Sequence, residues 1–329
     1  MRSEGLVKIF LVRMLPAILA CLFAANGWAQ AYPAKPVRYM IPMSPGSGAD
    51  TIGRIVAGGM TQVFGQQVII DNRTGAAGNI GAELAAKSPP DGYTLFQASM
   101  THAVNATLYP NLPYDLVRDF SPVTLVATSP SIVVVHPSLP VKSVAELVRL
   151  AKAQPGALNY ASTGAGSATF LAAEMFKNMA GLNIVHVPYR GGGEAISAVM
   201  TGEAPVYFSP LATALPLVRQ GRLRALAVTT LTRLPALREY PTVAELGYAG
   251  YQAGNWYGLV VPAKTPKETI EVIHNAVVAA LRNPAVSKRM DDLGYVVIAD
   301  PPEEFGAFIR SEIGKLAKIV RQVGASAIN

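Results

Sequence analysis

Hydrophobic positions in this chain recur with two different spacings, which alternate along most of its length. Short apolar runs such as 37–41 and 158–161 are typical of buried strands, and each is followed by a stretch with helical spacing. The first helical stretch begins near Asp50, and one of its faces carries Ile52, Ile55, Val56, Met60 and Val63. This alternation predicts an α/β fold with mostly parallel sheets.

The same spacing predicts most of the remaining elements. Two capping boxes mark helix starts, Ser143 with Glu146 and Thr265 with Glu268, and Asp300 to Glu303 opens a last helix that runs through Val323. Strands are expected at 67–71, 93–97, 123–127, 132–135 and 184–187, with a helix at 80–87 and another from 143 to 153.

Two loops that follow strands share an unusual composition. Ser44–Ala49 and Ser162–Ser167 are rich in Gly, Ser and Thr, contain no obvious catalytic side chain, and each precedes a helix. Such loops present backbone N–H groups at the positive end of a helix, which is a site for an anion. Because ligands of α/β sheets bind beyond the carboxyl ends of strands, we expect these two loops to hold one anion from two sides.

We expect one of these loops in each of two lobes. No Gly/Ser/Pro linker interrupts the chain, so the lobes should be joined by crossing strands, with the first crossing near 123–136 and the return near 257–262. The predicted division is a leader at 1–31, a first lobe made of 32–130 and 256–329, and a second lobe at 131–255.

The N-terminus has the layout of a secretory signal peptide. Basic residues precede an apolar run at 15–25, and Ala29-Gln30-Ala31 forms an A-x-A cleavage site. We therefore predict a periplasmic protein that is cleaved near Ala31. A lipoprotein with lipid on Cys21 is the alternative. Cys21 is the only cysteine, so the mature chain would contain no disulfide.

Charge and motifs exclude several classes of function. Removing residues 1–31 takes three basic residues and one acidic residue from a formal charge of +7, which leaves about +5. No dense basic run is present, so nucleic acid is not an expected partner. His102, His136, His186 and His274 stand far apart without metal-ligand spacing, and the chain lacks nucleotide-binding signatures. We expect neither a metal nor a cofactor.

Three residues of the loops allow more than one interpretation. Ser47 or Ser167 is a nucleophile if the fold brings a histidine to it, which would make the protein a secreted hydrolase; otherwise both are hydrogen-bond donors. Asp50 is either a general acid/base or a carboxylate that binds an ammonium group, or else a first-turn acid that stabilises the helix dipole or supports residues that contact the ligand.

Two further segments also leave alternatives open. Trp256 and Tyr257 either stack on a ligand or pack in the core. The segment 189–194 follows the strand at 184–187 and opens another helix, so it is either a third anion contact, through Arg190 or backbone N–H groups, or a solvated turn.

Taken in order, several segments resemble the Bug family, the extracytoplasmic substrate-binding proteins of tripartite tricarboxylate transporters. The matching segments are Tyr32-Pro33-Ala34-Lys35-Pro36, Pro45-Gly46 with Asp50 and Arg54, 71–81 (DNRTGAAGNIG), 90–95 (PDGYTL), 102–105 (HAVN), 137–143 (PSLPVKS), 186–192 (HVPYRGG), 241–245 (PTVAE) and 262–266 (PAKTP).

The resemblance implies a periplasmic binding protein type II fold, with two α/β lobes joined by two crossing strands around a ligand cleft. It implies a monomeric solute-binding protein, not an enzyme, that captures a small carboxylate and delivers it to the membrane subunits of a tripartite tricarboxylate-type transporter. A sensor kinase is the alternative partner. In the family the two loops hold one carboxylate group, partly through ordered water.

Mapped onto this chain, the resemblance implies one set of ligand-binding residues. They are Met43, Ser44, Gly46, Ser47, Gly48, Ala49, Asp50, Thr101, Ser162, Thr163, Gly164, Ala165, Gly166, Ser167, Tyr189 and Ser209.

The chain departs from the family pattern at Met43-Ser44, Ser47-Gly48, Phe170 and Ser209. These positions would line the cleft or its edge, so the departures bear on which ligand is bound and not on the fold. Apart from Asp50, the mapped residues include no acid that could pair with an ammonium group. We therefore predict a ligand without an amino group: a dicarboxylate, a hydroxy or keto acid, or an aromatic acid.

Overall fold

The computed structural model describes residues 32–109, 111–189 and 191–323. The predicted signal peptide, Cys21 and Arg190 lie outside the described residues. The chain divides into two units, Met1–Ala34 and Lys35–Asn329, and every described helix and strand belongs to the second unit.

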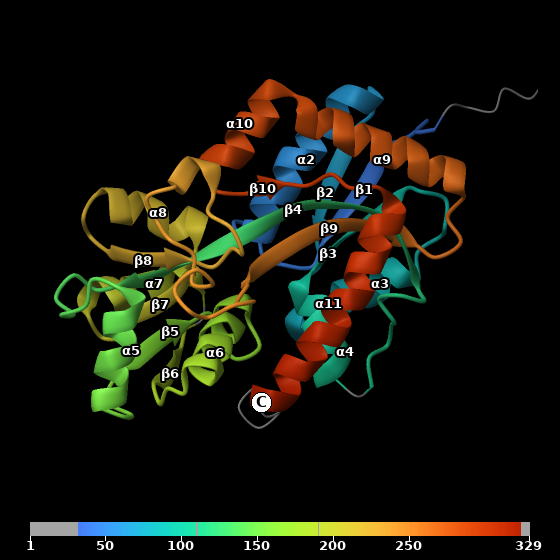
Figure 1. Cartoon of the computed structure of the whole chain (residues 1–329). Coiled ribbons are helices and arrows are strands. Elements are labelled where there is room, and N and C mark those ends of the chain that lie inside the picture. Colours follow the sequence, from blue (N-terminus) through green and yellow to red (C-terminus); the bar gives the residue numbers. More distant parts are fainter. Residues whose placement is uncertain (1–31, 110, 190, 324–329) are drawn as a thin grey trace, which may run out of the picture. The chain divides into compact units, whose positions relative to one another are not determined.

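One ten-stranded sheet organises this unit (Figure 1), and its strand order is β2-β1-β3-β9-β4-β7-β5-β6, with β8 and β10 also paired to β4. The strands are β1 (Val37–Ile41), β2 (Val68–Asn72), β3 (Thr94–Ser99), β4 (Phe120–Val135), β5 (Asn159–Ser162), β6 (Val185–Pro188), β7 (Val206–Pro210), β8 (Arg224–Val228), β9 (Gly254–Pro262) and β10 (Val296–Val297).

The sheet is mixed, so the expectation of mostly parallel sheets is wrong. Strands β2, β1 and β3 are parallel to one another, and so are β6, β5 and β7. Every pairing of β4 and β9 is antiparallel. The two parallel groups are the ones that the strand–helix alternation predicted, and β4 and β9 are the strands that lie between them.

The expected strands at 123–127 and 132–135 form one continuous strand, β4. Its first part pairs with β9 as far as Pro130, and from Ser131 it pairs with β7 and β8. At the change of partner the N–H of Ser131 donates to the hydroxyl of Thr229, so the break in the apolar pattern does not end the strand.

Ten α-helices flank the sheet in the described residues. They are α2 (Gly48–Phe64), α3 (Asn79–Ala86), α4 (Met100–Leu108), α5 (Val144–Ala153), α6 (Ala168–Ala180), α7 (Gly192–Thr201), α8 (Leu211–Arg219), α9 (Lys267–Arg282), α10 (Pro284–Asp292) and α11 (Pro302–Val323). Helix α2 packs with α9 and α10, whereas α11 packs with α4. Figure 1 shows the first group above β1, β3 and β9 and the second group below them.

Local signals at the helix ends predicted some caps correctly and others not. Ser143 caps α5 by accepting from the N–H of Glu146, as expected. The cap predicted at Thr265 is wrong, because Pro266 is the residue before α9 and the Thr265 hydroxyl donates to the carbonyl of Pro262. Val63 lies on the predicted buried face of α2 but is 48% exposed, since it belongs to the last turn.

The core on the side of α11 forms around aromatic side chains. Phe96, Phe120, Trp256 and Phe305 are all buried there. Gly258 on β9 gives Phe305 its room, because a Cβ at this glycine would lie 2.0 Å from the ring. Strand β9 and helix α11 therefore pack closely at Gly258, which has no side chain.

Candidate functional site

A cavity of about 640 Å³ opens where the two predicted loops meet. The loop before α2 and the loop before α6 both line it, together with residues of β4 and β9. Residues from the starts of α4, α7 and α8 complete the wall. The two loops lie 113 or more positions apart in the chain, and residues of both line this one cavity.

The first residues of five helices line this cavity. They include Gly48 of α2, Thr101 of α4, Ala168 of α6, Gly192 of α7 and Ala212 of α8. Each helix N-terminus carries about half a positive charge and unsatisfied N–H groups. No Asp, Glu, Lys, Arg or His occurs among the described lining residues. The positive potential of the cavity therefore comes from the backbone, which suits an anion.

A buried carboxylate supports the first loop. Asp50 accepts from the N–H of Gly46 at 2.8 Å and from the side chains of Arg54 and Asn72. Burial raises the pKa of Asp50, but these three hydrogen bonds outweigh it and leave the pKa below its ordinary value. Asp50 is 3% exposed and does not line the cavity, so it supports the loop instead of facing a ligand.

Two tyrosines approach the same loop from the other side. A Cβ on Gly48 would lie 3.2 Å from the hydroxyl oxygen of Tyr257 and 3.4 Å from that of Tyr295. Burial raises the pKa of Tyr257 to about 12, so its hydroxyl remains a donor at neutral pH. The sequence left two interpretations for Trp256 and Tyr257, stacking on a ligand or packing in the core. Tyr257 lines the cavity, whereas Trp256 belongs to the core.

The second loop is held by a serine and a histidine. The Ser162 hydroxyl lies 2.6 Å from Nε2 of His186 and also accepts from the N–H of Gly164. Burial lowers the pKa of His186, which favours the neutral imidazole. Gly164 and Gly166 have φ of 105° and 74°, a region that favours glycine. Ser167 then caps α6 by accepting from the N–H of Phe170.

The structure places most of the predicted residues around one space. Ten of the sixteen line the cavity, namely Met43, Gly46, Ser47, Gly48, Ala49, Thr101, Thr163, Ala165, Gly166 and Ser167.

The other predicted residues point elsewhere. Asp50 and Ser162 are buried and hold the loops by hydrogen bonds, the N–H of Gly164 donates to Ser162, and Ser44 is exposed. The Tyr189 hydroxyl donates to Glu203, and the buried Ser209 donates to the carbonyl of Pro210.

Several lining residues are not among those expected from the sequence. Three of them, Gly191, Gly192 and Gly193, belong to the segment 189–194. The sequence marked this segment as either a third anion contact or a solvated turn. Asn105 belongs to the family-matching segment 102–105, whereas no local pattern singles out the others, which include Leu108, Tyr109, Ser129, Ser131, Thr213, Asn255 and Tyr295.

The hydrolase interpretation needs a histidine beside Ser47 or Ser167. In the described part of the chain neither hydroxyl contacts one, since both accept from helical N–H groups. The serine that does contact a histidine is Ser162, which is fully buried and does not line the cavity. Nor do the described residues contain a group of His, Cys, Asp and Glu side chains that could hold a metal ion.

The family described as the tripartite tricarboxylate transporter family receptor matches residues 52–325. The chain belongs to this family. Protein BugT of Bordetella pertussis is 34% identical over 304 residues, which cover 92% of this receptor and 93% of BugT.

Two solved structures place the receptor among carboxylate-binding relatives. R. palustris Rpa4515 with adipate has a TM-score of 0.81 and 33% identity, covering 89% of the receptor and 98% of that chain. MatC from Rhodopseudomonas palustris with bound malate has a TM-score of 0.77 and 29% identity, covering 88% and 100%. The family consists of periplasmic substrate-binding receptors, not enzymes, and the receptor shares their two-lobed α/β fold. None of the described helices is long and apolar enough to span a bilayer.

Proposed function

We propose that this receptor captures a small carboxylate in the 640 Å³ cavity and delivers it to the membrane subunits of a tripartite tricarboxylate-type transporter. The observation that carries the proposal is the meeting of five helix N-termini at a cavity whose described lining has no charged side chain. Because Lys and Arg are missing from that lining, an anion would be held by directed N–H and hydroxyl donors.

The two loops are suited to hold one carboxylate group between them. Backbone N–H groups at the starts of α2 and α6 would serve there, together with the hydroxyl of Ser47, whose oxygen accepts from its own helix. The Ser167 hydroxyl also pairs with the Thr169 hydroxyl at 3.1 Å, so its hydrogen would exchange that contact for a ligand. Hydrogen bonds to a charged acceptor are shorter and about twice as strong as neutral ones. The remaining proposed ligand-binding residues would shape the cavity around this group.

Further lining residues would serve a second acidic group. The starts of α7 and α8 supply Gly192, Gly193 and Thr213 to the lining. Adipate and malate, which two solved relatives bind, are both dicarboxylates. We therefore favour a dicarboxylate, and a hydroxy, keto or aromatic acid is the weaker candidate. An amino acid would bury an ammonium group without a counter-charge. Asp50 already forms an ion pair with Arg54 and does not line the cavity.

Capture would proceed by closure of two lobes, 32–130 with 256–329 and 131–255. This division follows the change of partners along β4, where β9 pairs up to Pro130 and β7 begins at Ser131. Each lobe would contribute one of the two loops, so a bound carboxylate would favour the closed form. Closure would exclude water from the ligand, and its hydrogen bonds to the protein are stronger in a medium of low dielectric constant.

The remaining features of the proposal follow from the sequence and the family. The receptor would be exported by its signal peptide, cleaved near Ala31 and active as a monomer in the periplasm, without enzymatic activity. The alternative is a sensing role, in which the loaded form docks on a sensor kinase. Deleting the gene and measuring uptake and transcription separately distinguishes the two, because loss of uptake alone supports transport.

A thermal-shift screen followed by calorimetry tests the ligand class. Adipate and malate are compared with benzoate, glutamate, aspartate and glucose. We expect at least one dicarboxylate to raise the melting temperature and to bind with 1:1 stoichiometry. Binding of glucose or glutamate with micromolar affinity, while every acid without an amino group fails, would overturn the proposal.

A further inference from the structure

Three hydroxyl groups of the second loop and the first turn of α6 are in hydrogen-bonding contact. They belong to Thr163, Ser167 and Thr169, and all three residues line the ligand cavity. The hydroxyl oxygen of Thr169 lies 3.2 Å from that of Thr163 and 3.1 Å from that of Ser167. These groups form a hydroxyl chain, with Thr169 at its centre and Thr163 and Ser167 as its two ends.

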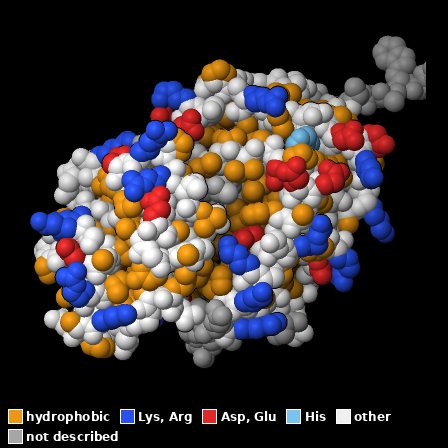
Figure 2. All heavy atoms as spheres, viewed as in Figure 1, with side chains coloured by type: hydrophobic (Ala, Val, Ile, Leu, Met, Phe, Trp, Pro, Cys, Tyr) orange, Lys and Arg blue, Asp and Glu red, His pale blue; other side chains and the backbone are white. Residues whose placement is uncertain are grey.

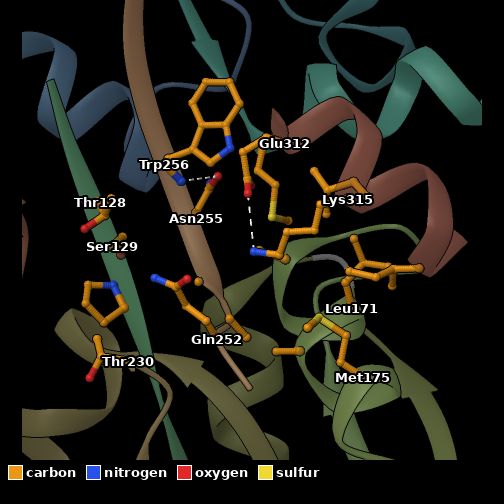
Figure 3. Close-up of a pocket in the computed structure, with 18 of the residues that line it drawn as sticks. Thr128, Ser129, Leu171, Met175, Thr230, Gln252, Asn255, Trp256, Glu312 and Lys315 are labelled. Atoms are coloured by element: carbon orange, nitrogen blue, oxygen red, sulfur yellow. Dashed lines mark hydrogen bonds and ion pairs between the residues drawn. The ribbon is translucent and has the colours of Figure 1, made fainter. Parts of the chain in front are cut away.

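Only the first turn of α6 reaches the ligand cavity. Farther along the helix, Leu171 and Met175 border a smaller cavity of about 110 Å³, where Figure 3 shows them together with Glu312 and Lys315 of α11. On the face drawn in Figure 2, charged side chains stand around a centre of hydrophobic ones, and the described lining of the ligand cavity contains no charged side chain. Discrimination between acids of equal charge therefore depends on hydroxyl and N–H groups.

Several N–H groups of the second loop already have acceptors. The N–H of Thr163 donates to the Thr169 hydroxyl at 3.0 Å. The N–H of Gly164 donates to Ser162, and that of Ser167 donates to the carbonyl of Gly164. A ligand at this loop would therefore meet the ends of the hydroxyl chain as well as the remaining N–H groups.

The hydrogens of the hydroxyl chain can be counted. A hydroxyl has one hydrogen to donate and two lone pairs with which to accept. One lone pair of Thr169 accepts from the N–H of Thr163, so Thr169 must donate to one end of the chain and accept from the other. Two of the three hydroxyl hydrogens are used within the chain, and one remains for a ligand.

Tyr207 does not change this count. Burial raises the pKa of Tyr207 and a contact with Thr169 lowers it, so the two side chains lie near each other. The Tyr207 hydroxyl nevertheless has no hydrogen-bond partner among the described residues. It therefore leaves the second lone pair of Thr169 to the hydroxyl chain.

The two ends of the hydroxyl chain are unlike in either direction of donation. If Ser167 donates to Thr169, the hydrogen of Thr163 is free. Ser167 then keeps one lone pair, because its other lone pair accepts from the N–H of Phe170. If Thr163 donates to Thr169 instead, the hydrogen of Ser167 is free and Thr163 keeps its lone pairs. In both arrangements one end donates to a ligand and the other end accepts from it.

We propose that Thr169 is a positioning residue that makes this site prefer acids with a hydroxyl group on the carbon next to the carboxylate. The inference rests on the proposed function. A carboxylate offers only acceptors, so a plain dicarboxylate would pair with the donor end alone. In a 2-hydroxy acid the carboxylate would accept from one end while the neighbouring hydroxyl donates to the other. A 2-oxo acid again offers only acceptors.

Calorimetry with matched acids measures this preference in the full-length protein. Succinate is compared with each enantiomer of malate, glutarate with 2-hydroxyglutarate and 2-oxoglutarate, and adipate with 2-hydroxyadipate, so that several chain lengths are covered. We expect the better enantiomer of a hydroxy acid to bind roughly five- to tenfold tighter than the plain acid, which is the effect of one additional hydrogen bond. The 2-oxo acid should bind no tighter than glutarate.

Variants assign the preference to the hydroxyl chain. Thr169→Val frees the hydrogens of both ends, so both can donate to one carboxylate, and we expect the two affinities to come within twofold of each other. Thr169→Ser keeps the central hydroxyl and should keep the preference. Thr163→Val removes one end and should abolish the preference as well, which provides the test if Thr169→Val does not fold.

Tyr207→Phe is the matched control. It removes a buried hydroxyl that lies outside the hydroxyl chain, so the ratio of the two affinities should stay within twofold of that in the unmodified protein. A purely structural role of Thr169 would weaken the binding of both acids alike and would leave this ratio unchanged in Thr169→Val.

Two results would overturn the inference while the proposed function stands. One is equal binding of plain and hydroxy acids by the unmodified protein. The other is a preference that survives both Thr169→Val and Thr163→Val. If none of these acids bound, the inference would also be wrong, and the carboxylate screen described above would decide whether the proposed function fails with it.

Discussion

The hydroxyl of Tyr295 donates a 2.9 Å hydrogen bond to the carbonyl of Gly48, a residue 247 positions earlier in the chain. Gly48 is the first residue of α2, and its neighbours form the first of the two loops that line the cavity. The bond ties this loop to the segment after α10, so the position of its N–H groups depends on residues that no local pattern connects.

Removing that bond should weaken carboxylate binding and destabilise the fold by similar free energies. In Tyr295→Phe the carbonyl of Gly48 loses its partner but keeps its place beside Tyr257, so we expect affinity to fall roughly three- to tenfold and stability to fall by about 1 kcal/mol. Calorimetry and urea denaturation measure the two effects. Tyr240→Phe, which changes a tyrosine outside the described cavity lining, is the matched control, and an equal loss of affinity there would contradict the assignment.

Gly166→Val should abolish binding while the fold remains intact by circular dichroism. Gly166 has φ of 74° and lines the cavity, so valine would force this backbone into another conformation and move the N–H groups of the loop. Gly181→Val is the control, because Gly181 has φ of 61° but only ends α6. If both variants retained full affinity, the second loop would be only a connector.

Ser47→Ala should reduce stability and affinity together. The Ser47 oxygen accepts from the N–H of Asp50 and caps α2, and losing such a cap costs about 1 kcal/mol. Its hydrogen is free for a ligand, and a hydrogen bond to a charged group contributes about 1.5–3 kcal/mol. Ser143→Ala removes a cap of the same kind from α5 and should reduce stability alone. A Ser47→Ala protein with unchanged affinity would limit this residue to capping.

His102 should make the protein less stable as the pH falls from about 6.5 to about 4. Burial lowers the pKa of His102 from 6.5 to about 4, so the unfolded chain takes up this proton at a higher pH than the folded protein does. The contribution of neutral His102 to the free energy of unfolding is complete above pH 6.5 and is lost as the pH approaches 4. A full shift of this size corresponds to about 3 kcal/mol.

The variant His102→Gln, which keeps a side chain able to reach the Ser99 N–H, tests this pH dependence. The fall in unfolding free energy between pH 6.5 and 4 should be smaller than in the unmodified protein, whereas His136→Gln on the surface should leave it unchanged. An equal fall in all three proteins would show that carboxylates alone cause it.

Gly258→Ala should be among the most destabilising single changes. Its Cβ would lie 2.0 Å from the ring of Phe305, so β9 and α11 would have to move apart, at a cost of about 3 kcal/mol or more. Gly314→Ala is the contrasting variant, since a Cβ at Gly314 in α11 meets nothing within 4 Å. There we expect a gain of about 0.5–1 kcal/mol. Thermal denaturation compares the two, and similar melting temperatures would contradict the packing argument.

The sequence predicted those parts of the fold that depend on neighbouring residues. Hydrophobic spacing located β1, β5 and the long helices, and Gly/Ser composition located the two loops, because strand, helix and turn preferences act over a few residues. It predicted β4 as two strands, since the polar residues between 128 and 131 break the apolar run. In the folded protein Thr229 and β9 supply the hydrogen bonds that continue the strand.

The sequence by itself located two Gly/Ser/Thr-rich loops before helices, for which we predict anion binding, and the family of substrate-binding receptors to which the chain belongs. Only the tertiary structure decided which side chains face the ligand cavity. Asp50 follows the first loop and Ser162 begins the second, yet neither lines the cavity, and their side chains contact Arg54 and His186. Tyr295 and Asn255 lie far from the loops in sequence yet line the cavity. A local pattern fixes the course of the backbone, whereas the direction of a side chain depends on partners that only folding brings within hydrogen-bonding distance.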